Sequence, residues 1–207
     1  EDSIYDEFVA AIVEQANAIR VGDPSDPSTQ MGPLVSAVAR DRSLEYTKIA
    51  LAEGATLAAG GVVPDLPEHL HKGFFFAPTV ISNATNDMRC AQEEIFGPVM
   101  VVARFSDEDD AIRQANDIPF GLGAAVWTRD VARAHRVSER IESGMVWVND
   151  HHRASPTMPW GGVKDSGSGK QSGREAFEDQ TIVKTVVVRT AASDVDWYGT
   201  NDHKRLN

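Results

Sequence analysis

The sequence predicts an α/β protein in which a parallel sheet is covered by helices on both faces. Short runs of β-branched and apolar residues alternate with amphipathic segments between residues 99 and 149. Neighbouring parallel strands need crossover connections, and a helix in each crossover packs onto the sheet. With 42% hydrophobic and 25% charged residues, the 207-residue chain can bury a sizeable core, as one large unit or two modest ones.

Two helices and a short strand are expected first. Apolar residues recur at four-residue spacing over residues 4–19, which predicts an amphipathic helix, and Ser3 is placed to cap it. Ser36 is placed to cap a second helix that extends to residue 53, and Gly54 is expected to end it. A short strand over residues 55–58 follows.

A loop and an irregular strand are expected next. Residues 62–72 contain two prolines and no helical period, which predicts a surface loop. His69 and His71 lie in this loop, and because no cysteine or third histidine is nearby, we expect no metal site. Residues 74–81 are rich in β-formers but include Pro78, so the prediction is an edge or irregular strand.

A regular alternation of strands and helices occupies the centre of the chain. Its expected elements are a strand at 99–105, a helix capped by Ser106 and ending at 117, a strand at 124–128, a helix capped by Asp130 and ending at 141, and a strand at 145–149. After them we expect a glycine-rich loop at 161–173, a short helix at 174–180, a β-branched strand at 182–190, and a polar tail at 191–207 anchored by Trp197 and Tyr198.

Charge and cysteine content narrow the class of protein. The formal net charge of −11 opposes binding to nucleic acid or to an anionic membrane, so neither partner is expected. The sequence shows no signal peptide and no apolar run of about 20 residues, which predicts a cytoplasmic protein. The one cysteine, Cys90, cannot form an internal disulfide, in keeping with a reducing compartment. The chain opens at Glu1 directly into a helix, which indicates a fragment or processed piece.

A candidate ligand site precedes the strand that begins at Val99. Residues 93–99 (EEIFGPV) place two acids, an aromatic residue and a Gly-Pro corner at the mouth of this strand. Ligands of open α/β sheets bind in crevices at strand ends, and an exposed carboxylate beside a flat apolar ring suits a sugar hydroxyl next to a planar heterocycle. A simple surface turn is the alternative interpretation.

Residues 93–99, followed downstream by residues 159–167 (PWGGVKDSG), resemble the signature of the NAD(P)-dependent aldehyde dehydrogenase superfamily. The resemblance extends from Ile4 to about Thr190. It implies that Glu94 holds the nicotinamide ribose of NAD or NADP and that Phe96 packs beside the nicotinamide. It also implies a partial catalytic domain over residues 1–180, an oligomerisation strand over 181–190 and a tail over 191–207.

The same resemblance implies the partners and the location of the chemistry. The partners are a small aldehyde substrate, the protein's own N-terminal cofactor-binding domain, and a second copy of the chain that pairs with the segment from Ile182 to Arg189. The family's nucleophilic cysteine and general-base glutamate belong before Glu1, so no catalytic residue is expected in this chain. Cys90 has only Arg89 as a basic neighbour in the sequence, which argues against a nucleophile.

By resemblance, residues 149–160 line the substrate funnel, which makes Asn149, His151, His152 and Trp160 candidate pocket residues. Proline before Trp160 fixes its approach, and two glycines after it leave space beside the indole. By the same resemblance, a tryptophan at this place occurs in family members that accept amino- or trimethylammonio-aldehydes, and an indole can hold such a cation, so betaine-aldehyde-like substrates are one candidate. Apolar packing of Trp160 against the sheet and plain surface positions for the histidines are the alternatives.

The sequence departs from the family pattern at two positions. Gln171 stands where a proton-relaying glutamate often follows the glycine-rich loop, and Ala77 stands where a ribose-contacting glutamine often precedes Pro78. Cofactor affinity is therefore expected to depend more heavily on Glu94. The alternative function is a non-catalytic assembly or regulatory module that keeps the fold and lacks the chemistry.

Overall fold

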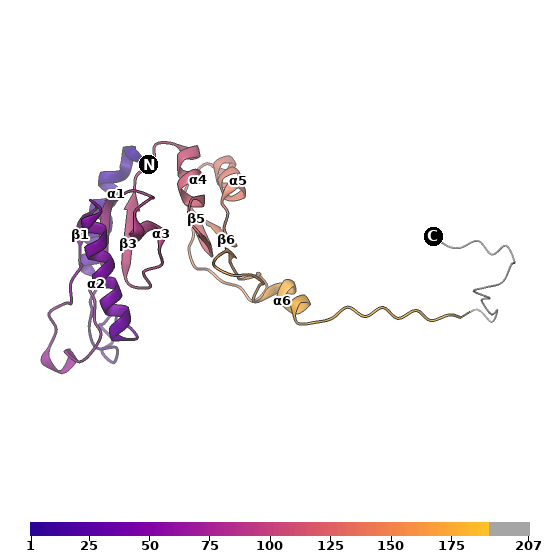
Figure 1. The fold of residues 1–207 in the computed structure, drawn as a ribbon, viewed down its shortest axis with the longest axis horizontal. Helices are drawn as coiled ribbons and strands as arrows, with labels where there is room; N and C mark the ends of the chain where they lie inside the picture. The colour runs from indigo at the N-terminus through magenta and orange to yellow at the C-terminus, as the bar shows by residue number, and fades with distance from the viewer. Residues whose placement is uncertain (191–207) are drawn as a thin grey trace.

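The structure is a computed structural model that describes residues 1–190, and these form two bodies side by side (Figure 1). The first body contains η1 (Asp2–Ile4), α1 (Tyr5–Ala18), α2 (Ala37–Ala52), β1 (Thr56–Ala59), η2 (Glu68–Leu70), β2 (Thr79–Ala84), α3 (Arg89–Gln92) and β3 (Val99–Ala103). The second contains α4 (Glu108–Asn116), β4 (Phe120–Gly121), β5 (Gly123–Val126), α5 (Val131–Arg140), β6 (Met145–Val148), β7 (Val163–Lys164) and α6 (Gly173–Asp179).

β2 is the central strand of the three-stranded sheet in the first body. It pairs antiparallel with β1, where Ile81 lies opposite Leu57, and parallel with β3. An edge position is therefore wrong, whereas an irregular strand is confirmed by the register shifts on both sides of β2. Pro78 lies just before the first strand residue, Thr79, so its missing N–H interrupts no hydrogen bond of the ladder.

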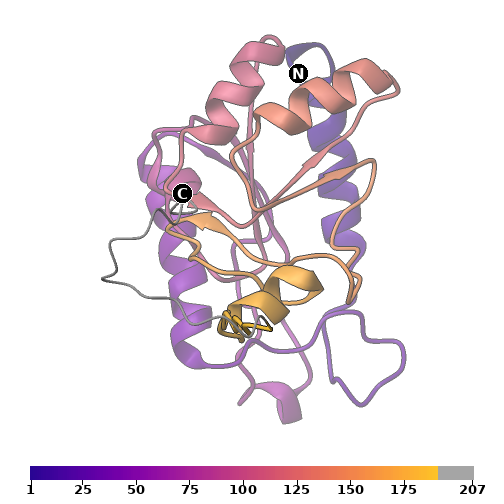
Figure 2. The same cartoon turned by 90° about the vertical axis from the view of Figure 1, so that its right-hand side faces the viewer.

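Helices cover both faces of this sheet, as Figure 2 shows for the indigo α1 and the purple α2. The core on one face consists of buried side chains from α2, β2, α3 and the segments beside them: Tyr46, Ala50, Ala55, Ile81, Ala84, Cys90 and Ile95. The core under α1 on the other face consists of Tyr5, Ala59, Val80 and Val102. Successive side chains of a strand point to opposite faces, so Val80 and Ile81 serve different cores.

The second body confirms the predicted alternation of strands and helices, but the pairing of its strands differs from the prediction. β5 and β6 form a parallel pair, as expected, whereas β4 pairs antiparallel with β7. The described strands form three separate sheets, and antiparallel pairs occur in two of them. The prediction of one parallel sheet is therefore wrong, although two strand pairs, β2–β3 and β5–β6, are parallel.

Of the five residues predicted to cap or end a helix, three agree with the structure and two do not. The Ser36 hydroxyl accepts the N–H of Ala39 at 3.2 Å, the Asp130 carboxylate accepts two N–H groups at the start of α5, and Gly54 follows α2 with φ of +100°. Asp107, rather than Ser106, caps α4. The Ser3 side chain caps nothing, because residues 2–4 form a 3₁₀ turn before α1.

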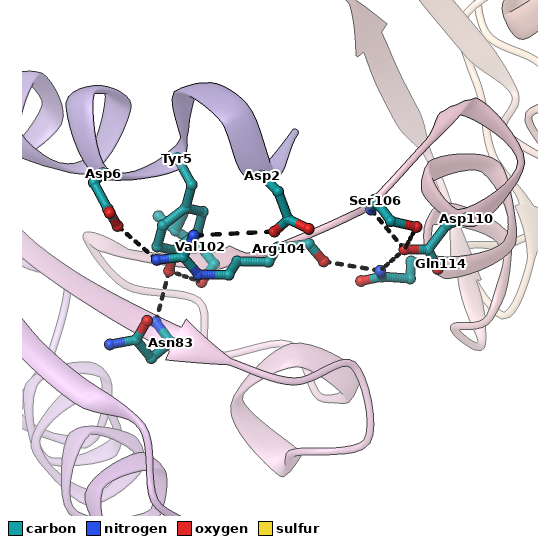
Figure 3. Close-up of polar contacts among 9 residues, drawn as sticks. All are labelled: Asp2, Tyr5, Asp6, Asn83, Val102, Arg104, Ser106, Asp110 and Gln114. Atoms are coloured by element: carbon teal, nitrogen blue, oxygen red, sulfur yellow. Dashed lines mark hydrogen bonds and ion pairs between the residues drawn. The ribbon is translucent and has the colours of Figure 1, made fainter.

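Tyr5 joins the start of α1 to the sheet at an irregular point of β2 (Figure 3). The register between β2 and β3 shifts after Ile81, and Asn83 takes a left-handed conformation with φ of +53°. The Tyr5 hydroxyl accepts the N–H of Asn83 at 2.7 Å and donates to the Val102 carbonyl at 3.0 Å. This buried phenol therefore replaces the ladder hydrogen bonds that the irregularity removes.

Tyr5→Phe is expected to lower the free energy of unfolding by about 1–3 kcal/mol, because it leaves the Asn83 N–H and the Val102 carbonyl without a partner. Arg104→Met is the comparison variant. The Arg104 guanidinium lies 3.7 Å from the centroid of the Tyr5 ring and pairs with Asp6 at the surface. Loss of that contact costs about 0.5–1 kcal/mol. Urea unfolding of both variants measures the difference, and an equal or smaller loss for Tyr5→Phe would refute the bridging role.

The predicted strand at 182–190 is not a strand in the structure of a single chain. Residues 181–190 extend away from α6 with no strand assignment (Figure 1), and Ile182 and Val183 are almost fully exposed. The predicted tail and its anchors, Trp197 and Tyr198, lie outside the described residues. Within residues 1–190 no helix has the length and apolar character needed to cross a bilayer.

Candidate cofactor and substrate site

The segment before β3 turns its acid and its aromatic ring outwards because Ile95 between them is buried. Ile95 packs into the core beside Tyr46, while Phe96 is 75% exposed and has φ of +58°. A left-handed conformation costs a non-glycine residue about 1–3 kcal/mol, and such strain concentrates at functional sites. A Cβ on Gly97 would lie 2.1 Å from the buried Ser43 hydroxyl, so only glycine fits against α2 at this corner.

The two acids of this segment have different surroundings. The Glu93 carboxylate accepts hydrogen bonds from the Arg89 guanidinium at 2.7 and 3.0 Å and from the Tyr46 hydroxyl. The hydrogen bonds from Arg89 and Tyr46 lower the pKa of Glu93 to about 2. The exposed Glu94 carboxylate has no hydrogen bond or ion pair within residues 1–190, and only its backbone carbonyl is engaged, by Arg42. Glu93 therefore holds the segment in place, and Glu94 remains available to a ligand.

A sugar diol beside a planar ring fits this arrangement. The Glu94 carboxylate is an acceptor for two hydroxyl donors, and the exposed Phe96 ring presents an apolar face two residues away. The Ile95 anchor and the glycine corner fix the backbone between them. The family resemblance of the sequence implies the nicotinamide-ribose end of a dinucleotide at Glu94 and Phe96, and this role stays a prediction.

A second group of predicted residues meets at the end of β6, around Trp147. The Trp147 ring centroid lies 5.6 Å from that of His151, 6.0 Å from that of His152 and 5.9 Å from that of Trp160. Trp147 is 8% exposed, and its indole N–H donates to the Arg153 carbonyl at 2.9 Å. The structure thus brings together three of the predicted pocket residues on a buried indole. Sequence reasoning missed Trp147, although its place two residues before Asn149 was a signal.

The glycine-rich loop holds Trp160 in this group. Trp160 and Gln171 exchange two backbone hydrogen bonds of 2.6 Å, and the Lys170 ammonium donates to the Gly161 and Gly162 carbonyls at 3.0 and 3.1 Å. Gly144 must be glycine, since a Cβ there would lie 1.8 Å from the Gly161 oxygen. The hydrogen bonds of the loop therefore fix the position of the Trp160 indole.

Asn149 has a structural contact that the sequence did not reveal. Its side-chain amide accepts the Thr128 N–H and donates to the Thr128 carbonyl, both at 2.8 Å, so it joins the ends of β5 and β6. A role for Asn149 at a substrate stays a prediction. Glu94 and Phe96 belong to the first body and share none of the ring contacts around Trp147.

Two other residues that the sequence raised as candidates are buried or hydrogen-bonded in the described part of the chain. Cys90 is 4% exposed in the core under α2, and burial raises the pKa of its thiol, which favours the unreactive form. His71 contacts the Leu66 carbonyl at 2.7 Å, and no cluster of potential metal ligands is found among residues 1–190.

Comparison with known proteins gives a consistent family match. Residues 1–186 match the group described as the aldehyde dehydrogenase family. Betaine aldehyde dehydrogenase of Bacillus subtilis (strain 168) is 43% identical over 198 residues, which cover 96% of this chain and 40% of the relative. The corresponding protein of Brucella melitensis is 48% identical over 192 residues, covering 93% and 39%.

Solved structures agree with the sequence comparison. The crystal structure of betaine aldehyde dehydrogenase from Staphylococcus aureus in complex with NAD+ superposes with a TM-score of 0.89 at 41% identity, covering 96% of this chain and 39% of that one. This chain therefore spans about 40% of the length of the curated relatives and solved structures that it matches.

Proposed function

The chain belongs to the aldehyde dehydrogenase family, and from this premise we propose that it is the C-terminal part of an enzyme that oxidises an aldehyde to a carboxylic acid with NAD+ or NADP+. The observation that carries the proposal is the Glu94 carboxylate, which has no partner within residues 1–190, beside the exposed Phe96 ring. NAD(P)+, when bound, supplies the acceptor for the hydride. Relatives that are 43–48% identical bear the name betaine aldehyde dehydrogenase, and one solved neighbour holds NAD+.

In this proposal Glu94 and Phe96 place the reactive end of the cofactor. The Glu94 carboxylate would accept hydrogen bonds from the ribose hydroxyls of the cofactor and so orient the sugar. The exposed Phe96 ring would shield the nicotinamide from water. Binding of the adenosine half falls to an N-terminal cofactor-binding domain, so the residues of this chain do not decide between NAD and NADP.

The bond-making groups of the proposed reaction lie outside these 207 residues. A cysteine thiolate attacks the aldehyde carbonyl, the resulting intermediate loses a hydride to become a thioester, and a water activated by a glutamate hydrolyses it. Cys90 does not serve as this nucleophile, because it is buried and its pKa is raised. The parent enzyme is expected to act in the cytoplasm.

We place the substrate against the aromatic group of Trp160, His151 and His152, with Trp147 behind them. Indole faces attract quaternary ammonium groups, so trimethylammonio-aldehydes such as betaine aldehyde are the proposed substrate class. The hydrogen bonds of the glycine-rich loop hold the Trp160 indole in place without substrate, which lowers the entropic cost of ordering the indole on binding.

The test of this substrate class compares betaine aldehyde with 3,3-dimethylbutanal, a neutral molecule of the same shape. In the complete enzyme, Trp160→Ala is expected to lower kcat/KM for betaine aldehyde about 2- to 30-fold more than for the neutral aldehyde. Trp127→Ala is the matched control, because that indole is 69% exposed and lies outside the ring contacts. An equal loss of kcat/KM for both aldehydes would show that Trp160 is an apolar wall with no preference for a cation.

We further propose that the segment from Ile182 to Arg189 pairs with another copy of the chain in a homo-oligomer. Its valines are strongly exposed, with Val183 at 94% and Val187 at 88%, and an extended β-branched segment of this kind is a site for strand addition. Deletion of residues 182–207 is expected to give monomers or aggregates by light scattering. Deletion of residues 191–207 alone is the control and keeps the oligomer. The same oligomer from both deletions would contradict the proposal.

A further inference from the structure

We propose that Gln92 is a positioning residue that sets how Glu94 in the first body lies relative to the aromatic group around Trp160 in the second. This inference rests on the proposed function, because it concerns the alignment of a bound cofactor with a bound aldehyde. Hydride transfer needs its donor and acceptor atoms about 3–3.5 Å apart. The two half-sites belong to different bodies, so contacts between the bodies must fix their spacing.

No sheet joins the two bodies in the described part of the chain. β3 belongs to one sheet, and β5 and β6 form another. Two hollows lie between the bodies, one of about 640 Å³ lined by Tyr5 and Trp127 among others, and one of about 450 Å³ lined by Asn83 and Asp117 among others. The placement of one body against the other therefore depends on the connecting segment at 104–107 and on side-chain hydrogen bonds that cross between them.

Gln92 makes such a crossing next to the residues assigned to the cofactor. It ends α3, the helical turn that leads into Glu93 and Glu94, and Figure 1 shows α3 on the side of the first body that faces the second. The half-buried Gln92 amide donates to the Asp117 carbonyl at 2.8 Å and to the Asn86 carbonyl at 2.5 Å, which engages both of its N–H donors. Asn86 donates to the same Asp117 carbonyl at 3.1 Å.

The loop after α4 that receives Gln92 also contacts the strand beside the substrate group. Lys164, in β7, donates to the Asn116 carbonyl at 2.6 Å and pairs with the Glu142 carboxylate at 2.8 Å. The Asn116 side chain accepts the Glu142 N–H at 2.9 Å. β7 lies within the glycine-rich loop whose hydrogen bonds hold Trp160. A continuous set of contacts thus connects Gln92 with the indole.

Loss of this crossing is expected to separate alignment from binding. Gln92→Met keeps the length and the neutral charge of the side chain and removes both donors. Glu94 and Trp160 keep their own surroundings, so we expect the Kd of the cofactor and the KM for betaine aldehyde to stay unchanged. Hydride transfer is expected to slow about 10-fold, since a displacement of about 1 Å costs on the order of 100-fold.

The experiment compares the wild type, Gln92→Met and Gln30→Met in the complete enzyme. Gln30→Met is the matched control, because the Gln30 side chain accepts the Arg20 N–H at 3.0 Å in a loop of the first body. Single-turnover NAD(P)H formation, the Kd of NAD(P)+ and the KM for betaine aldehyde are measured, and the control is expected to match the wild type. A purely structural role of Gln92 would weaken binding along with hydride transfer.

Three results would overturn the inference: a wild-type rate of hydride transfer in Gln92→Met, an equal fall in Gln30→Met, or a parallel loss of ligand binding in Gln92→Met. The split between an unchanged Kd and a slower transfer supports it.

A second readout needs neither cofactor nor activity. Spin labels on Lys48→Cys in α2 and Glu139→Cys in α5, with Cys90→Ala to remove the native thiol, report the distance between the bodies in the 207-residue chain. We expect a narrow distribution of distances without further change and with Gln30→Met, and a broader or shifted one with Gln92→Met. A distribution that Gln92→Met leaves unchanged would overturn the inference.

Failure of this inference and failure of the proposed function give different results. If the complete enzyme oxidises aldehydes and Gln92→Met leaves both hydride transfer and the label distances unchanged, only the positioning role is removed. If it oxidises no aldehyde with NAD+ or NADP+, the proposed function is removed and the alignment of cofactor and substrate with it.

Discussion

A protein made of these 207 residues alone is expected to form no NADH from any aldehyde. Its one cysteine lies in the core with Ile81 and Ile95, 4% exposed, and burial raises the pKa of its thiol. Loss of a nucleophile and its base removes about a million-fold of catalysis in enzymes that act through them. Incubation of the chain with NAD+ and a panel of aldehydes measures this directly.

The control for that experiment is Cys90→Ala. We expect the variant and the parent chain to stay at the rate without enzyme, because neither carries a usable thiolate. NADH formation that exceeds this rate and disappears in Cys90→Ala would make Cys90 the nucleophile. It would also show that the chemistry is contained in this chain.

In the complete enzyme, Glu94→Gln is expected to slow hydride transfer about 10- to 150-fold. The substitution removes a charged acceptor from the ribose hydroxyls, and hydrogen bonds to charged groups contribute about 1.5–3 kcal/mol. The Glu94 carboxylate has no other bond within residues 1–190, so the stability of the fold is expected to change little. Single-turnover NADH formation and cofactor affinity are the measurements, and wild-type values for both would refute the ribose assignment.

Glu93→Gln is the matched control with the opposite signature, because Glu93 bonds to Arg89 and Tyr46. The folded protein lowers the pKa of Glu93 from 4.5 to about 2. A lowered pKa contributes stability that is present above the unfolded value and is lost as the pH falls through the folded value. Glu93→Gln is therefore expected to reduce stability at neutral pH, and the difference from wild type is expected to vanish towards the folded pKa. An equal loss of cofactor affinity in both variants would remove the distinction between the two acids.

Local features of the fold were predictable from the sequence. The alternation from β3 to β6 follows from side-chain periodicity and from capping residues that lie next to the helices they start, as at Asp130. Strand pairing depends on residues far apart in the chain. Thr56 pairs with Ser82, and Phe120 pairs with Lys164, so the antiparallel pairs and the central place of β2 were not visible in any local pattern.

The candidate site was predictable in its residues but not in their contacts. Glu93 and Glu94 are adjacent in the sequence, and only the distant Tyr46 and Arg42 show which of them has a free carboxylate. Trp147 was missed because a tryptophan in an apolar strand resembles ordinary core, and its place two residues before Asn149 was the one local signal against that interpretation. The segment after α6 shows the same limit, since its proposed partner is another copy of the chain.

The most direct test of the central claim is product formation by the complete enzyme that contains this chain. Purified enzyme is incubated with betaine aldehyde and either NAD+ or NADP+, each cofactor in its own reaction. NAD(P)H and carboxylic acid are both measured. The account predicts one NAD(P)H for each acid formed, with a rate that falls when Glu94 is replaced by glutamine. Formation of neither product with any aldehyde, or acid without NAD(P)H, would contradict it.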